Sequence, residues 1–123
     1  MATTAVHYTP GAQVTIKAGA DLTAGTFVKI SASWDDRRNP VVTPAAAADT
    51  PFGFVRNDTV KDDYVTVYRG KYIADFVAEG NIKGGAAVAI GAAGKVKAAA
   101  EGATAVGIAT ADASNGYVSV AVN

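Results

Sequence analysis

Apolar and polar residues alternate along several short segments of the chain, which is typical of β-strands that bury one face. The clearest alternation covers residues 13–18 and 72–78, and apolar segments at 26–31, 41–43 and 64–69 have the length of strands. Five further strands are expected at 51–56, 86–90, 95–97, 105–110 and 116–122. Because turn-forming Gly and Pro residues separate these segments, the pattern predicts short strands joined by turns.

The predicted strands occur twice in the same order, which indicates an internal repeat. The aligned pairs are residues 14–30 with 74–90, Val42 with Val96, 52–54 with 106–108, and 64–67 with 117–120. The offset between the copies therefore falls from 60 to 54 and then to 53. We interpret the chain as one β domain at 12–123, with copies at about 12–69 and 71–123, preceded by an N-terminal arm at 1–11.

The amino-acid composition favours strands over helices. The chain has 16 Val and 6 Ile but a single Leu, and β-branched side chains suit a pleated sheet. The alanine-rich runs at 45–48 and 98–100 are interpreted as loops with at most a helical turn, because Pro and Gly residues bound them. Gly53 and Gly107 lie at matched positions inside strands, which predicts a bulge, a bend or a close backbone approach.

The predicted fold class is therefore all-β. The duplicated strand unit is compatible with a small β-sandwich, a barrel or a β-clip-like arrangement, and these alternatives stay open at this point. The arm is expected to be extended.

The first copy carries an insertion that the second copy lacks. Six extra residues fall within 31–40, where the second copy has only residues 91–94. The insertion contains the only Trp, Trp34, together with Arg37 and Arg38. Because Trp and Arg are the residues found most often at interface hot spots, we expect these three side chains to contact a partner. The alternative is a solvated loop with Trp34 packed on its own domain.

The N-terminal arm precedes the repeat and has Val6 and Tyr8 as its only sizeable apolar residues. One interpretation is an arm that orders on a neighbouring subunit or on another protein, by strand addition or by insertion of Tyr8. The other is a disordered tail, which is common at chain ends. Val6 and Tyr8 therefore complete the set of candidate interface residues.

The chain lacks the residues that several kinds of catalytic and metal sites need. The chain has no Cys and one His, His7, and its acidic segment 57–63 lacks the spacing of a calcium loop. We expect no catalytic, metal or cofactor site, so the protein is predicted not to be an enzyme. Eleven basic and eleven acidic residues give a net charge of zero, which does not favour nucleic acid or a membrane as partner. No targeting segment is recognised, so synthesis in the host cytoplasm is expected.

The sequence resembles phage head-decoration proteins, also called capsid cement proteins. The residues that carry the resemblance are Gly84–Ile90, Gly94-Lys95-Val96, Val106-Gly107-Ile108-Ala109 and Gly116–Asn123. The resemblance implies an all-β virion protein on the capsid exterior that binds the major capsid protein, stabilises the assembled head and self-associates as a homotrimer. It also implies that the arm lies on the shell. The Trp34–Arg38 segment does not match the family pattern.

A second function remains open at this stage. A β domain displayed on a virion or a tail is also suited to recognise carbohydrate or a host surface. Trp34, Tyr64, Tyr68 and Tyr72 would supply faces on which sugar rings stack.

Overall fold

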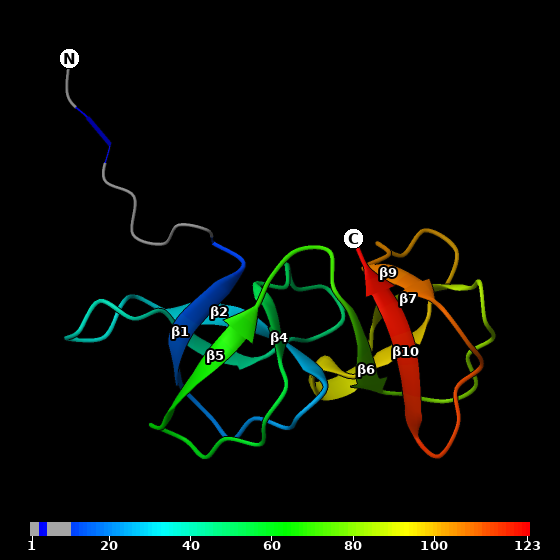
Figure 1. The fold of residues 1–123 in the computed structure, drawn as a ribbon, viewed down its shortest axis with the longest axis horizontal. Helices are drawn as coiled ribbons and strands as arrows, with labels where there is room; N and C mark the ends of the chain where they lie inside the picture. Colours follow the sequence, from blue (N-terminus) through cyan, green and yellow to red (C-terminus); the bar gives the residue numbers. More distant parts are fainter. Residues whose placement is uncertain (1–2, 5–10) are drawn as a thin grey trace.

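The computed structural model describes residues 3–4 and 11–123, and within these residues the protein is built almost wholly of β-strands (Figure 1). The first half contains β1 (Gln13–Ala18), β2 (Thr26–Ala32), β3 (Val41–Pro44), β4 (Gly53–Val55) and β5 (Tyr64–Tyr68). The second half contains β6 (Ile73–Val77), β7 (Ala87–Ile90), the 3₁₀ turn η1 (Ala92–Gly94), β8 (Val96–Ala98), β9 (Gly107–Ala109) and β10 (Tyr117–Val122). The all-β prediction is confirmed, and every predicted strand has a counterpart.

The two halves form two units with the same strand pairing. The first unit is a closed barrel in the order β1-β3-β2-β4-β5, and the second is a sheet in the order β6-β10-β9-β7-β8. Each antiparallel pair of the first unit recurs in the second, for example β1 with β5 and β6 with β10. The parallel pair β1–β3 is reduced in the second unit to a single bridge between Ala78 and Val96.

The strand registers follow the offsets between the sequence copies. Val14 lies opposite Val67 in the first unit, and the residues 60 and 53 positions later, Ala74 and Val120, lie opposite one another in the second. A shift of one residue would turn every side chain to the wrong face of the sheet. The agreement therefore shows that both units keep the same inward and outward positions.

Gly53 and Gly107 mark the same close approach in both units. A Cβ atom at Gly53 would overlap the carbonyl oxygen of Tyr68 on β5, and one at Gly107 would overlap the carbonyl oxygen of Ala121 on β10. Neither glycine has a positive φ, so glycine is needed for space rather than for backbone conformation. The predicted close backbone approach is confirmed.

The alanine-rich runs form no α-helix. Residues 46–49 make a turn in which the Asp49 N–H donates to the Ala46 carbonyl oxygen at 3.0 Å. Ala98 ends β8 instead of starting a helix. The 3₁₀ turn η1 lies in the short β7–β8 connection, where the first unit has its insertion.

Two clusters of apolar side chains form the core. One fills the first barrel with Val14, Ile16, Ala18, Leu22, Val28, Val42, Val55 and Val67. The other lies in the second unit and also takes in Phe27 and Phe54, which project from the outer face of the first unit. The ring of Phe76 stacks on Phe27 with centroids 4.7 Å apart and meets Phe54 edge-on at 5.0 Å. These aromatic contacts join the two units.

Candidate functional site

The insertion forms a loop at the end of the first unit that points away from the second unit (Figure 1). We call residues 33–40, between β2 and β3, the Trp34 loop. Trp34 is 49% exposed, and the guanidinium of Arg38 lies 6.0 Å from the centre of its ring. At that distance a cation–π interaction is favourable. The structure thus brings Trp34 and Arg38 together on an exposed loop, with Arg37 beside them in sequence.

Asp35 organises this loop. One oxygen of its carboxylate accepts the backbone N–H groups of Arg37 at 2.9 Å and Asn39 at 2.8 Å, and the other accepts the Tyr64 hydroxyl at 2.6 Å. An Asp that binds backbone N–H groups just ahead of it is a common way to stabilise a turn. Arg38 adopts a φ of +62° within the turn. The loop is therefore an ordered structure tied to β5.

The hydrogen bond between Asp35 and Tyr64 shifts both titrations. The Tyr64 hydroxyl, followed by the Asn39 N–H, lowers the pKa of Asp35 below its ordinary value because both stabilise the carboxylate. The same bond raises the pKa of Tyr64, because the phenol is the donor and Asp35 is negative. Sequence reasoning missed Asp35. The available signal was an Asp followed closely by Asn39-Pro40, a combination typical of turns.

Ile30 extends the exposed surface beside the loop. It is 47% exposed at the end of β2, and with Ala32, Ser33 and Trp34 it borders a shallow hollow. The result is an apolar surface next to the guanidinium of Arg38. Such a surface is suited to contact another protein by apolar packing together with charged hydrogen bonds.

The other two candidate residues, Val6 and Tyr8, lie outside the described residues. The arm joins the described domain at Gly11, and Ala12 directly precedes β1. The expectation that the arm contacts a partner stays a prediction.

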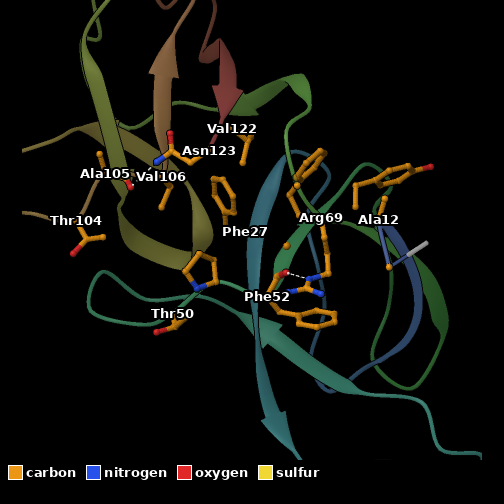
Figure 2. A pocket seen from close by; sticks show the side chains of 16 residues that line it. Ala12, Phe27, Thr50, Phe52, Arg69, Thr104, Ala105, Val106, Val122 and Asn123 are labelled. Atoms are coloured by element: carbon orange, nitrogen blue, oxygen red, sulfur yellow. Dashed lines mark hydrogen bonds between the residues drawn. The ribbon is translucent and has the colours of Figure 1, made fainter. Parts of the chain in front are cut away.

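A groove between the two units lies beside the C-terminus (Figure 2). We call it the C-terminal groove; its volume is about 690 Å³, and Phe27, Phe52, Val106 and Val122 are among its apolar walls. Arg69 is already engaged there, because its Nε donates to the Phe52 carbonyl oxygen at 2.8 Å and its guanidinium lies 4.5 Å from the Phe52 ring centre. The groove brings together no acid–base pair.

The four aromatic residues proposed to stack on sugars lie in two separate places. Trp34 lies in the Trp34 loop and Tyr64 bonds to that loop from β5, whereas Tyr68 and Tyr72 pack near the junction of the units. The Tyr68 ring stacks on Phe54 at 5.8 Å and meets Tyr72 edge-on at 5.6 Å. Packing within the protein therefore accounts for Tyr68 and Tyr72.

Asp21 and Asp58 hold two neighbouring loops of the first unit together. Asp58 accepts the Ala24 N–H at 2.8 Å, and Asp21 accepts the Lys61 N–H at 2.9 Å. Within residues 3–4 and 11–123, no cluster of three or more His, Cys, Asp or Glu side chains is arranged to hold a metal ion. The same part of the chain contains no helix long and apolar enough to span a membrane.

Comparisons with known proteins identify a family and show similarity to solved structures. A sequence profile of the phage cement proteins matches residues 6–123. The fold is similar to a crystal structure described as the head fiber gp8.5 N base of bacteriophage phi29, with a TM-score of 0.76 and 22% identity. That match covers 90% of this chain and 92% of the other. No curated protein sequence matches the chain.

Proposed function

Because the chain belongs to the phage cement protein family and is a structural, capsid-associated protein of the virion, we propose that it binds the exterior of the assembled head and stabilises it. The proposed partner is the major capsid protein. The observation that supports a specific contact is the Trp34 loop, where the exposed Trp34, with the Arg38 guanidinium near its ring, lies beside Ile30. The loop is held in shape by Asp35 before any partner binds, which lowers the entropic cost of binding.

In this proposal the arm and the Trp34 loop bridge neighbouring capsid subunits, and their contacts oppose the internal pressure of packaged DNA. Each copy adds a modest contact that is repeated over the capsid lattice. Many such contacts stabilise the shell because binding to the assembled form shifts the equilibrium away from dissociated subunits. A structural role of this kind needs no catalytic group.

We further propose that the protein self-associates as a homotrimer. The support is the family resemblance together with an apolar side chain left exposed on the outer face of β9, Ile108, which is 52% exposed. Light scattering coupled to size-exclusion chromatography measures the mass in solution. A mass of three chains is expected, and a mass of one chain at high concentration contradicts the trimer.

The contact surfaces are tested with purified heads that lack this protein. Deletion of residues 1–9 should abolish binding while circular dichroism shows a folded domain. Trp34→Ala should weaken binding by about thirtyfold, the effect of losing a hot-spot side chain worth about 2 kcal/mol. Val60→Ala is the matched control, since Val60 is 59% exposed in a different loop. Unchanged binding by the deletion or by Trp34→Ala would remove that element from the proposal.

Copy number separates this function from a binding module on a tail or vertex. Mass spectrometry of intact particles gives the ratio of this chain to the major capsid protein. A ratio near one to one is expected for a protein that covers the head lattice. A few copies per particle would instead favour the module that recognises carbohydrate or a host surface.

A further inference from the structure

Strand β6 uses only one of its two edges along most of its length. The Val122 N–H donates to the Tyr72 carbonyl oxygen at 2.9 Å, and the Ala78 N–H donates to the Gly116 carbonyl oxygen at 2.8 Å. These bonds flank the antiparallel register of β6 with β10. Because alternate residues of an antiparallel strand face opposite neighbours, the backbone groups of the even-numbered residues 72–78 face β10.

The odd-numbered residues of β6 therefore face away from β10. Val77 follows this rule, because its N–H donates at 2.9 Å to the carbonyl oxygen of Gly25 in the first unit. The N–H groups of Ile73 and Asp75 also face away from β10. Within the described part of the chain, neither N–H has a backbone acceptor. Gly25 lies against the Asp75 carbonyl and marks one end of the open edge. The open edge thus runs from Ile73 to Asp75.

A groove with a volume of about 450 Å³ follows this open edge, and we call it the β6 groove. Its lining residues come from both units: Ala24, Gly25, Phe54, Val55, Arg56 and Tyr68 from the first, and Tyr72, Ile73, Ala74, Asp75 and Tyr117 from the second. Ile73 is 71% exposed and Tyr117 is 55% exposed. The groove therefore combines unpaired strand backbone with aromatic walls, which is the chemistry that recognises an extended peptide.

The charges at the groove are balanced. Arg56 lies with its guanidinium 5.7 Å from the centre of the Tyr68 ring, and Asp75 provides one carboxylate on the opposite strand. A groove of this kind suits a segment with no strong net charge.

We propose that the β6 groove binds an extended segment of the capsid shell protein by strand addition to β6. The segment would pair its backbone with Ile73 and Asp75 and place an apolar or aromatic side chain against Tyr68 and Tyr72. This inference rests on the proposed function, which supplies the shell as partner. The root of the arm lies near one end of this groove, because the Tyr72 hydroxyl donates to the Ala12 carbonyl oxygen at 3.5 Å. If the arm of the same chain occupied the groove, β6 would already be protected from exchange in the free protein at every concentration, and this result would overturn the inference.

Proline substitution tests the backbone contact directly. Ile73→Pro and Asp75→Pro each remove one N–H that faces the groove, and Pro is tolerated on an edge strand where the N–H faces solvent. Each should weaken binding to heads that lack this protein by at least about tenfold. Ile73→Ala is the matched control, because it removes the side chain but keeps the N–H, and its loss should stay within about threefold.

A second proline checks the assignment of the two edges. Ala74→Pro removes an N–H that faces β10, so this variant should unfold at a clearly lower temperature than Ile73→Pro or Asp75→Pro. Equal melting temperatures for all three variants would contradict the assignment of an open edge.

Hydrogen exchange on the unmodified protein keeps the proposal testable if a proline variant fails to fold. The peptide that covers β6 should exchange at least about tenfold more slowly on the head than in free solution. Unchanged exchange in β6, or full binding by folded Ile73→Pro and Asp75→Pro, overturns the inference while leaving head binding intact. Protection of β6 in the free protein that depends on its concentration would assign the groove to another copy and also overturn it. Failure of the unmodified protein to bind heads contradicts the proposed function itself.

Discussion

The two units share their strand pairing but differ in the use of their outer faces. In the first unit Phe27, Phe54 and Tyr68 lie side by side across β2, β4 and β5 on the outer face. The second unit covers this row, and Phe27 stacks on Phe76 within its core. The outer face of the first barrel is therefore a second buried surface, in addition to the interior that every barrel has.

The equivalent row in the second unit is left largely uncovered: Ala87 and Ile108 are exposed and Ala121 is half-buried. Its residues are Ala87, Ile108 and Ala121, which pair with one another in the same register. Ile108 is 52% exposed, whereas Phe54 at the equivalent position is 5% exposed. Strand pairing sets which outward-facing side chains lie side by side on a unit. The size of those side chains then decides whether they pack against the other unit. Large aromatic rings bury much more area than Ala and Ile.

The largest expected effect comes from removing a ring at the junction. Phe27→Ala should lower the free energy of unfolding by about 3–5 kcal/mol, because it leaves a cavity between the units. Ala87 already occupies the equivalent position in the second unit, so the comparison uses its neighbour in the same row: Ile108→Ala should cost less than about 1 kcal/mol. Urea denaturation measures both values. Equal losses would mean that the outer row of the second unit is also covered.

A smaller loss of stability is expected at the matched glycines, Gly53 and Gly107, where the two units have the same close backbone approach. Gly53→Ala and Gly107→Ala should each cost about 1–3 kcal/mol, because the added methyl group meets a backbone carbonyl that has little room to move. Gly11→Ala is the control, since a Cβ there has no atom of residues 3–4 or 11–123 within 4 Å, and its effect should stay within about 0.5 kcal/mol. A tolerated substitution at only one of the two strand positions would show that the crossings differ.

The closure of the second unit supplies the next prediction. In the first unit Lys17 and Ala18 both pair with β3, whereas the second unit has only the bridge from Ala78 to β8. Amide exchange in β8 should therefore be faster than in β3 by about five- to thirtyfold, which corresponds to an opening free energy lower by about 1–2 kcal/mol. Hydrogen exchange followed by mass spectrometry compares the two strands in one sample. Slower exchange in β8 than in β3 would mean that the single bridge holds β8 at least as firmly as the two paired residues hold β3.

The sequence predicted the strands and their duplication because alternation and matched glycines are local signals. It also pointed to Trp34 and Arg38, since an insertion between two copies is visible by alignment. It could not predict the junction, because Phe27 and Phe54 face outward from their own barrel and are buried only by the second unit. The tie between Asp35 and Tyr64 was equally hidden, since 29 residues separate the two side chains along the chain. Contacts of that range depend on the packed fold rather than on a local pattern.

The smallest expected effect concerns the loop that only the first unit carries. In Tyr64→Phe the Asp35 carboxylate loses a hydrogen-bond donor, so the pKa of Asp35 should rise toward its ordinary value, as carboxyl NMR signals would report. Because the pKa of Asp35 is lowered in the folded protein, its contribution to loop stability is present above the unfolded pKa and is lost as pH falls through the folded pKa. The fluorescence of Trp34, the only Trp, should therefore change at acid pH, and at a higher pH in Tyr64→Phe.

Asp112 provides the control for this titration. Its pKa is also lowered, first by the Gly84 N–H and then by Lys83, but it lies in the second unit away from the loop. Asp112→Asn should leave the pH midpoint of Trp34 fluorescence unchanged. If Asp112→Asn shifts the midpoint as Tyr64→Phe does, the acid transition belongs to the whole domain, and the insertion is not an independently titrating element of the first unit.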